Sequence, residues 1–169
     1  MIDLHVHTRH SCDAAAAIEE YCQRGICLGV NYICFTDHID CNQADLGYGY
    51  YNADRFFEEF NRAGDKYADK LNLLSGIEFS EPHIYRKEFD HYRKLPYDFI
   101  LGSVHYWMGD VFPSDMVKNQ YPVKTTFEKY WEEVFTLVSF GGFDSVAHLD
   151  FPKRYFKENH WTKAQLKDI

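Results

Sequence analysis

The chain has 169 residues, and its 46% hydrophobic and 18% aromatic content is enough for the packed core of a single domain over residues 1–169. The formal net charge is −8, and lysines and arginines form no run. This charge disfavours binding to a nucleic-acid backbone, which depends on a basic surface. We therefore expect a small substrate and no nucleic-acid partner.

The start of the chain has neither a basic segment nor an apolar leader, and no apolar run is long enough to cross a bilayer. These features predict a soluble, cytoplasmic protein without a membrane partner. The five cysteines are an odd number and include no Cys-x-x-Cys pair, so we expect them to be reduced.

Short β-type apolar runs alternate along the chain with longer amphipathic stretches, and this order predicts an α/β fold with a parallel sheet. The strands are expected at residues 2–6, 32–35, 71–77, 99–104 and 143–147. The helices are expected at residues 14–28, 53–70, 81–95 and 125–140. Residues 41–51 and 108–124 are predicted to be long loops, which in such folds often carry the binding site.

Each predicted strand ends in a residue type that binds metal ions. In a parallel βα barrel the carboxyl ends of the strands meet on one face, so these side chains are expected to converge. For any single histidine the alternative is a hydrogen-bonded loop residue, but five coincident strand ends favour a metal centre. The candidate metal ligands are His5, His7, Asp13, His38, Glu78, His105 and His148.

The composition of this ligand set indicates which ions it would hold. Imidazoles mixed with carboxylates suit zinc, manganese or iron, and the number of ligands implies two or three divalent ions with Glu78 as a bridge. The candidate catalytic residues are Glu78, His105 and Asp37, and we expect Asp37 and Asp150 to orient imidazoles rather than to bind metal. The histidines that match no strand end are expected on the surface or in substrate loops: His10, His83, His91 and His160.

The motifs that contain these ligands resemble the PHP superfamily, which includes histidinol-phosphate phosphatases and domains attached to bacterial DNA polymerases. The motifs are His5-Val6-His7, Thr36-Asp37-His38, Gly76-Ile77-Glu78 and the segments 98–105 and 147–150. Residues 11–14 and 102–105 are more similar to the histidinol-phosphatase branch. The resemblance implies a distorted (β/α)7 TIM-like barrel with three ions, held by His5, His7 and Glu78, by Glu78, His105 and His148, and by Asp13 and His38.

The sequence departs from the family pattern in one respect. The family adds an Asp-x-His pair from a late strand, whereas the histidine that follows His148 is His160, which has no aspartate two residues before it. With about five βα units we expect an incomplete barrel, truncated at the C-terminus inside a new helix at 161–169. Such a chain should have little activity alone, and its open barrel edges could support self-association.

The resemblance implies a metal-dependent phosphomonoesterase that converts L-histidinol phosphate to L-histidinol and phosphate in histidine biosynthesis, by attack of a hydroxide that bridges the ions. Arg154 and Lys153 are candidates for the substrate phosphate, with a solvated surface charge as the alternative for each. Two other functions stay open. One is a PHP phosphoesterase acting on nucleotides or oligonucleotides, and the other is a metal-binding domain without catalysis.

Overall fold

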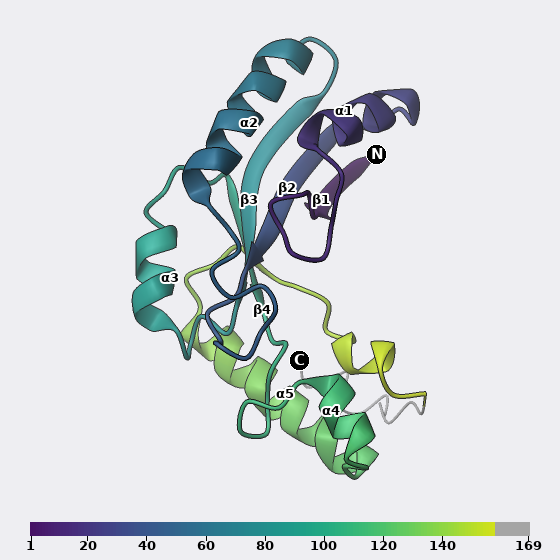
Figure 1. Cartoon of the computed structure of the whole chain (residues 1–169), viewed down its shortest axis with the longest axis vertical. Coiled ribbons are helices and arrows are strands. Elements are labelled where there is room, and N and C mark those ends of the chain that lie inside the picture. Colours follow the sequence, from purple (N-terminus) through teal and green to yellow (C-terminus); the bar gives the residue numbers. More distant parts are fainter. Residues whose placement is uncertain (158–169) are drawn as a thin grey trace.

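The computed structural model describes residues 1–157 and contains one parallel sheet with helices around it (Figure 1). The strands are β1 (Ile2–Val6), β2 (Tyr32–Ile39), β3 (Asn72–Ser80), β4 (Phe99–Ser103) and β5 (Ser145–Val146). Their order in the sheet is the order in the chain, β1-β2-β3-β4-β5. This sequential order is typical of a barrel, whereas a doubly wound sheet reverses its order. The predicted α/β fold, an incomplete barrel of about five βα units, is confirmed.

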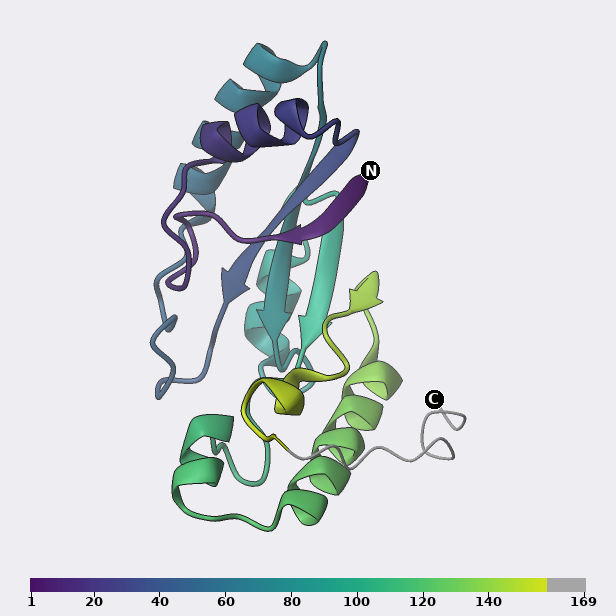
Figure 2. The ribbon, with the colours of Figure 1, turned by 90° about the vertical axis from the view of Figure 1, so that its right-hand side faces the viewer.

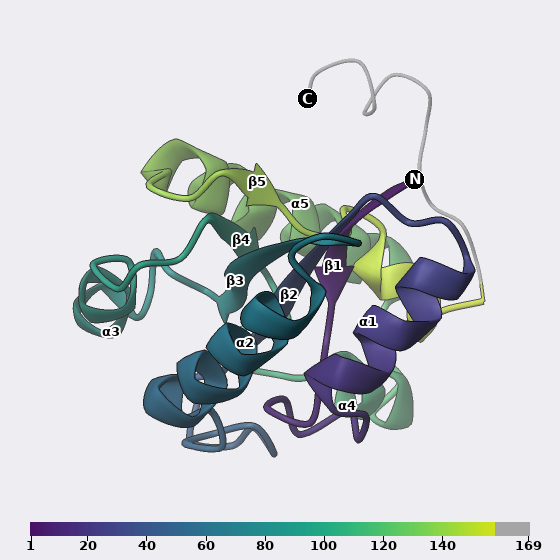
Figure 3. The ribbon, with the colours of Figure 1, turned by 90° about the horizontal axis from the view of Figure 1, so that it is seen from above.

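The helices follow the strands as the βα alternation predicts. They are α1 (Ile18–Cys27), α2 (Ala53–Tyr67), α3 (Arg86–Tyr92), α4 (Pro113–Lys118), α5 (Val123–Phe140) and a 3-10 helix, η1 (Phe151–Arg154). Figure 3 shows α1 and α2 side by side against one face of the curved sheet. Figure 2 shows α4 and η1 beyond the carboxyl ends of β2, β3 and β4, where they form walls around the ends of the strands.

Several predicted boundaries are wrong, and two of them have an identifiable cause. Helix α1 begins at Ile18 instead of residue 14, because the segment before it is held by side chains from other elements. Helix α4 lies within the stretch predicted to be a loop. Pro113 favours the start of a helix at its first position, and Met116, on the inner side of α4, is completely buried and fixes the helix to the core. Strand β2 continues to Ile39, and β5 is shorter than expected. The helix expected at 161–169 lies outside the described residues.

A shift in the pairing of β1 with β2 determines which face of the sheet the side chains of His5 and His7 point to. Ile2 and Asp3 pair with Tyr32 and Ile33, but Val6 pairs with Phe35, so β1 contains one extra residue between Asp3 and Val6. Strict alternation from Ile2 would place His5 on the face opposite to Ile2. The extra residue acts as a β-bulge and turns His5, and His7 just after the strand, to the same face as His38 and Glu78, which are paired in β2 and β3.

Two groups of buried side chains hold the fold together. One lies between the sheet and helices α1 to α3 and includes Phe35, Phe56, Ile77 and Phe79. The other lies between α5, α4 and η1 and includes Tyr130, Met116 and Phe151. The second group therefore supports the segment after β5 that carries a candidate ligand. Within residues 1–157, no helix combines the length and the apolar character needed to cross a bilayer.

Candidate metal centre

The seven predicted metal ligands lie together at the carboxyl ends of the strands. They line one cavity of about 700 Å³, together with residues of the loops around it. Residues far apart in the sequence therefore lie side by side, as the parallel βα topology predicts. The residues are His5, His7, Asp13, His38, Glu78, His105 and His148.

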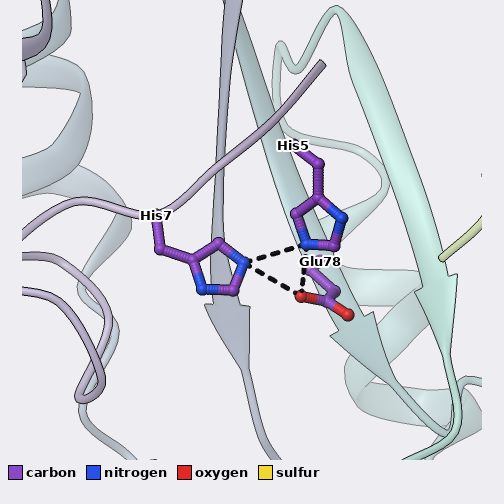
Figure 4. A group of neighbouring side chains, drawn as sticks. All are labelled: His5, His7 and Glu78. Atoms are coloured by element: carbon purple, nitrogen blue, oxygen red, sulfur yellow. Dashed lines mark hydrogen bonds and ion pairs between the residues drawn. The ribbon is translucent and has the colours of Figure 1, made fainter. Parts of the chain in front are cut away.

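Glu78 is the centre of this group, and its side chain is completely buried. Its Oε2 atom lies 2.8 Å from His5 Nε2 and 3.0 Å from His7 Nε2. Figure 4 shows both imidazoles pointing toward this oxygen from β1 and the residue just after it. The other oxygen, Oε1, lies 2.7 Å from His148 Nε2 and 3.3 Å from His105 Nε2. One carboxylate thus faces two separate pairs of imidazoles, as a bridging ligand would.

The distances between imidazole nitrogens fit the geometry of metal ligands. His5 Nε2 lies 3.0 Å from His7 Nε2, and His105 Nε2 lies 3.2 Å from His148 Nε2. Two imidazole lone pairs at such a distance repel each other unless a proton or a cation lies between them. Ligands on one tetrahedral zinc ion are separated by about 3.4 Å, which follows from Zn–N bonds of roughly 2.05 Å. The residues present therefore fit a cation within each pair.

Asp13 approaches the group from the loop between β1 and α1. Its carboxylate accepts a hydrogen bond from His7 Nδ1 at 3.1 Å, and it lies 3.6 Å from His38 Nε2. His38 Nδ1 in turn lies 3.6 Å from Glu78 Oε2. The donor atoms of His7, Asp13 and His38 are close enough to hold one ion. Asp13 can therefore either bind an ion with His38 or orient the ring of His7.

The charges of this cluster depend on one another. Burial opposes ionisation of Glu78, but the surrounding imidazoles outweigh it and hold the pKa of this carboxyl well below its usual value. Burial likewise disfavours a charged His7, yet Asp13 and Glu78 raise the pKa of His7 to about 9. The pKa of His105 is also raised against the effect of burial, through Asp40 and Glu78. Protons on these rings occupy the nitrogen atoms that a metal ion would need, so ion uptake should release protons.

Three polar residues that the sequence analysis missed hold His105 in place. Ser80 Oγ donates to Asp40 Oδ1 at 2.6 Å and lies 2.9 Å from His105 Nδ1, which must then donate to it. This chain uses Nδ1 of His105, so that Nε2, which faces Glu78 and the cavity, is the nitrogen that a cation could take from its proton. Glu81 accepts hydrogen bonds from the backbone of His105 and Tyr106, and burial raises its pKa to about 7. Ser80, at the end of β3, and Asp40, just past β2, each follow a candidate ligand by two residues, and this spacing could have identified them.

The two aspartates that were expected to orient imidazoles have other contacts. Asp37 is completely buried, and its carboxylate accepts hydrogen bonds from the backbone and hydroxyl of Thr8 and from the hydroxyl of Ser11. Asp150 pairs with Lys153 at 3.8 Å. Asp37 therefore holds the segment that follows His7 instead of an imidazole ring.

The two candidate phosphate-binding residues differ in their position relative to the cavity. Arg154 lines the cavity next to Phe151, with its guanidinium 5.6 Å from the ring centre. Lys153 does not belong to the residues that line it. Among the remaining histidines of the described chain, His10 contacts Glu59 at 2.8 Å and His83 contacts Glu133 at 2.5 Å, both away from the cluster. His160 lies outside the described residues.

Comparison with known proteins agrees with the family that the motifs indicate. The PHP domain family matches residues 3–168. The chain belongs to this family. This PHP domain is 30% identical over 158 residues to a protein of Clostridium acetobutylicum named "Probable histidinol-phosphatase", covering 92% of this chain and 59% of the relative. It is 27% identical over 159 residues to a histidinol-phosphatase of Lactococcus lactis, covering 91% of this chain and 58% of the relative.

Among solved structures, this PHP domain is similar to histidinol phosphate phosphatase of Lactococcus lactis, a structure complexed with zinc, L-histidinol and phosphate. The TM-score is 0.89 at 24% identity, over 99% of this chain and 65% of that one. This likeness supports the fold of an incomplete barrel. The chain spans about three fifths of the length of the curated relatives it matches.

Proposed function

We propose that this PHP domain holds two or three divalent transition-metal ions, with zinc, manganese and iron as candidates, and hydrolyses phosphate monoesters. The observation that carries the proposal is the buried Glu78 carboxylate, whose two oxygens face two pairs of imidazoles. Imidazoles offer lone pairs to a cation, unlike the lysines and arginines that usually neutralise a buried carboxylate. A group arranged in this way is expected to bind cations.

The proposed ligands divide into three groups by contact. His5, His7 and Glu78 Oε2 would hold one ion, and Glu78 Oε1 with His105 and His148 a second. Asp13 and His38 would hold a third. When bound, such ions supply a nucleophile near neutral pH and stabilise the charge on a transferring phosphoryl group.

Other residues of the chain would bind and position the substrate. The guanidinium of Arg154 lies on the cavity wall, where its planar donors could grip phosphate oxygens, and Lys153 is a second candidate. Glu78 and His105 would act in catalysis by fixing the positions of the ions, with His105 oriented by Ser80. Asp37 would contribute by holding the segment between His7 and Asp13.

We propose L-histidinol phosphate as the substrate, with L-histidinol and phosphate as products. The names of the relatives and the ligands of the Lactococcus lactis structure support this choice. The cavity also offers partners for each part of the molecule, because aromatic Tyr106, Phe112 and Tyr155 and acidic Asp45 line it. The reaction belongs to histidine biosynthesis, and we expect it in the cytoplasm. Self-association through the outer strands β1 and β5 is a separate expectation that sedimentation analysis would test.

Metal analysis and a substrate panel on the same preparation test the proposal. The protein is purified with zinc, manganese or iron supplied, and its metal content is measured by mass spectrometry. Phosphate release is then measured with histidinol phosphate, a nucleoside monophosphate, a short oligonucleotide and p-nitrophenyl phosphate. We expect more than one ion per chain and the highest rate with histidinol phosphate.

Each alternative function predicts a different result in this experiment. A preference for the nucleotide or oligonucleotide would favour another PHP phosphoesterase, and bound metal without phosphate release from any substrate would favour a metal-binding domain. Less than one transition-metal ion per chain after metal supplementation would contradict the metal centre itself.

A further inference from the structure

We infer that Glu59, a buried glutamate of α2 outside the cavity, is a positioning residue for Asp13: it holds the loop that carries Asp13 and thereby sets the affinity of the ion that Asp13 binds. The loop comprises residues 7–17, between β1 and α1, and is called the Asp13 loop below. The inference rests on the metal centre of the proposed function.

Glu59 uses both carboxylate oxygens on the Asp13 loop and its junction with α1. Oε2 accepts hydrogen bonds from Arg9 Nε at 3.0 Å and Nη2 at 2.8 Å, and from His10 Nε2 at 2.8 Å. Oε1 accepts from the backbone amide of Ile18 at 3.0 Å. Its side chain is 11% exposed. A carboxylate so buried and so fully bonded makes a rigid contact, because breaking it would leave charges without partners.

The Asp13 loop needs such an anchor because it contains no helix or strand after Val6. Its own backbone closes it at the base, where the amide of Arg9 donates to the carbonyl of Ala16 at 2.8 Å. Ala17, which precedes α1, has no side-chain oxygen to cap the helix. Glu20 accepts the amide of Ala17, and Glu59 accepts the otherwise unpaired amide of Ile18, the first residue of α1. Glu59 therefore fixes the side and the end of the loop to α2.

The geometry of Asp13 depends on this frame. Its side chain is 48% exposed, and its carboxylate contacts the rings of His7 and His38, which are themselves candidate ligands. The start of the loop is held separately by Asp37, which bonds Thr8 and Ser11. Glu59 reaches the later part of the loop, which carries Asp13, through the amide of Ile18 and through Arg9, whose own amide bonds the carbonyl of Ala16. Loss of these contacts should loosen that part while leaving the ligands on the strands in place.

Zinc binding by matched variants of the whole chain tests the inference. The variants are Glu59→Gln and, as control, Glu58→Gln, which changes a neighbouring side chain that is 70% exposed. Zinc affinity is measured by competition with a chromophoric chelator, and the zinc ion lost in Asp13→Asn defines the ion of interest. We expect Glu59→Gln to lower the affinity for that zinc ion by about tenfold, at the lower end of the effects typical of residues that support metal ligands. Glu58→Gln should leave it unchanged.

A double-mutant cycle separates positioning of Asp13 from a general loss of structure. In an Asp13→Asn background, Glu59→Gln should change the remaining zinc affinities by less than about twofold. Equal weakening in both backgrounds, or no weakening in folded Glu59→Gln protein, would overturn the inference. If Glu59→Gln does not fold, Arg9→Gln removes the same contact from the loop side, where the arginine is 53% exposed, and should give the same coupling. A wild-type chain that binds no zinc would instead refute the proposed function.

Discussion

The two loops that border the cavity are held in different ways. The Asp13 loop is bonded to two buried carboxylates on other elements, Asp37 of β2 and Glu59 of α2. The loop between β2 and α2 has no buried carboxylate bonded to its backbone from another element among the described contacts. Asn42 and Asp45 accept the amides two residues further on, and Tyr50 and Tyr51 reach Arg9 and Tyr97 through their hydroxyls. Its Leu46, at the rim of the cavity, is 94% exposed.

This difference corresponds to what each loop is proposed to do. A metal ligand must be held within a few tenths of an ångström, which requires supporting bonds from rigid elements. A loop that faces the substrate can be less constrained, because its side chains need to adapt to a molecule that enters and leaves. Support of a loop by buried charges from other elements is therefore a structural indication that the loop carries a ligand.

The largest expected effect is on metal content, and it should differ between Glu78, on a strand, and Asp13, on a loop. Glu78→Ala should remove two ions, because its two oxygens face two pairs of imidazoles, whereas Asp13→Ala should weaken mainly the third. Elemental analysis after dialysis measures the loss, and circular dichroism checks that both variants are folded. Equal losses in the two variants would contradict the bridging role of Glu78.

The next effect concerns the free energy of unfolding. Asp37→Ala should lower it by about 3 kcal/mol, because the Thr8 amide and the hydroxyls of Thr8 and Ser11 lose a buried acceptor. Asp45→Ala in the other loop removes the bond to the Gly47 amide and a contact with Tyr106, both of a partly exposed side chain, and should cost only about 1 kcal/mol. Urea denaturation of the two variants gives both numbers, and similar costs would remove the distinction between the loops.

A smaller effect is expected in the pH dependence of stability. Burial would raise the pKa of Glu59, but Arg9 and His10 outweigh it and lower this pKa below the ordinary value of 4.5. The ionised carboxylate therefore stabilises the fold above about pH 4.5, and this contribution disappears as the pH falls through the folded-state pKa. The stability difference between wild type and Glu59→Gln should shrink as the pH is lowered from 6 toward 3.5. Urea midpoints across this range measure it, and a difference that grows on acidification would refute the charge assignment.

The smallest effect is expected at the tip of the loop between β2 and α2. Leu46→Ser should change the free energy of unfolding by no more than about 0.5 kcal/mol, because the side chain loses almost no buried surface. Metal content should also stay the same. A loss of more than about 1 kcal/mol in urea denaturation would indicate that this loop packs more firmly than the described contacts account for.

The sequence by itself determined the sheet and the set of candidate ligands. Strands and helices alternate with a clear apolar pattern, and a parallel βα chain has to bring its strand ends to one face, so His38, Glu78 and His105 could be assigned to one centre from their positions alone. The resemblance to the PHP family rested on the same residues. The two-residue spacing from Glu78 and His38 also indicated Ser80 and Asp40. Their contact with His105 depends on the pairing of neighbouring strands and could be identified only in the structure.

The tertiary structure decided the features that depend on partners distant in the chain. The extra residue in β1 turns His5 and His7 toward Glu78, and only the pairing with β2 reveals it. Helix α1 starts at Ile18, where Glu59, 41 residues later, accepts its first amide, whereas the sequence pattern predicted a start at residue 14. Local propensity is a property of neighbouring residues, while a buried carboxylate bonds whichever donors the fold brings to it, and so these contacts could not be predicted from the sequence pattern.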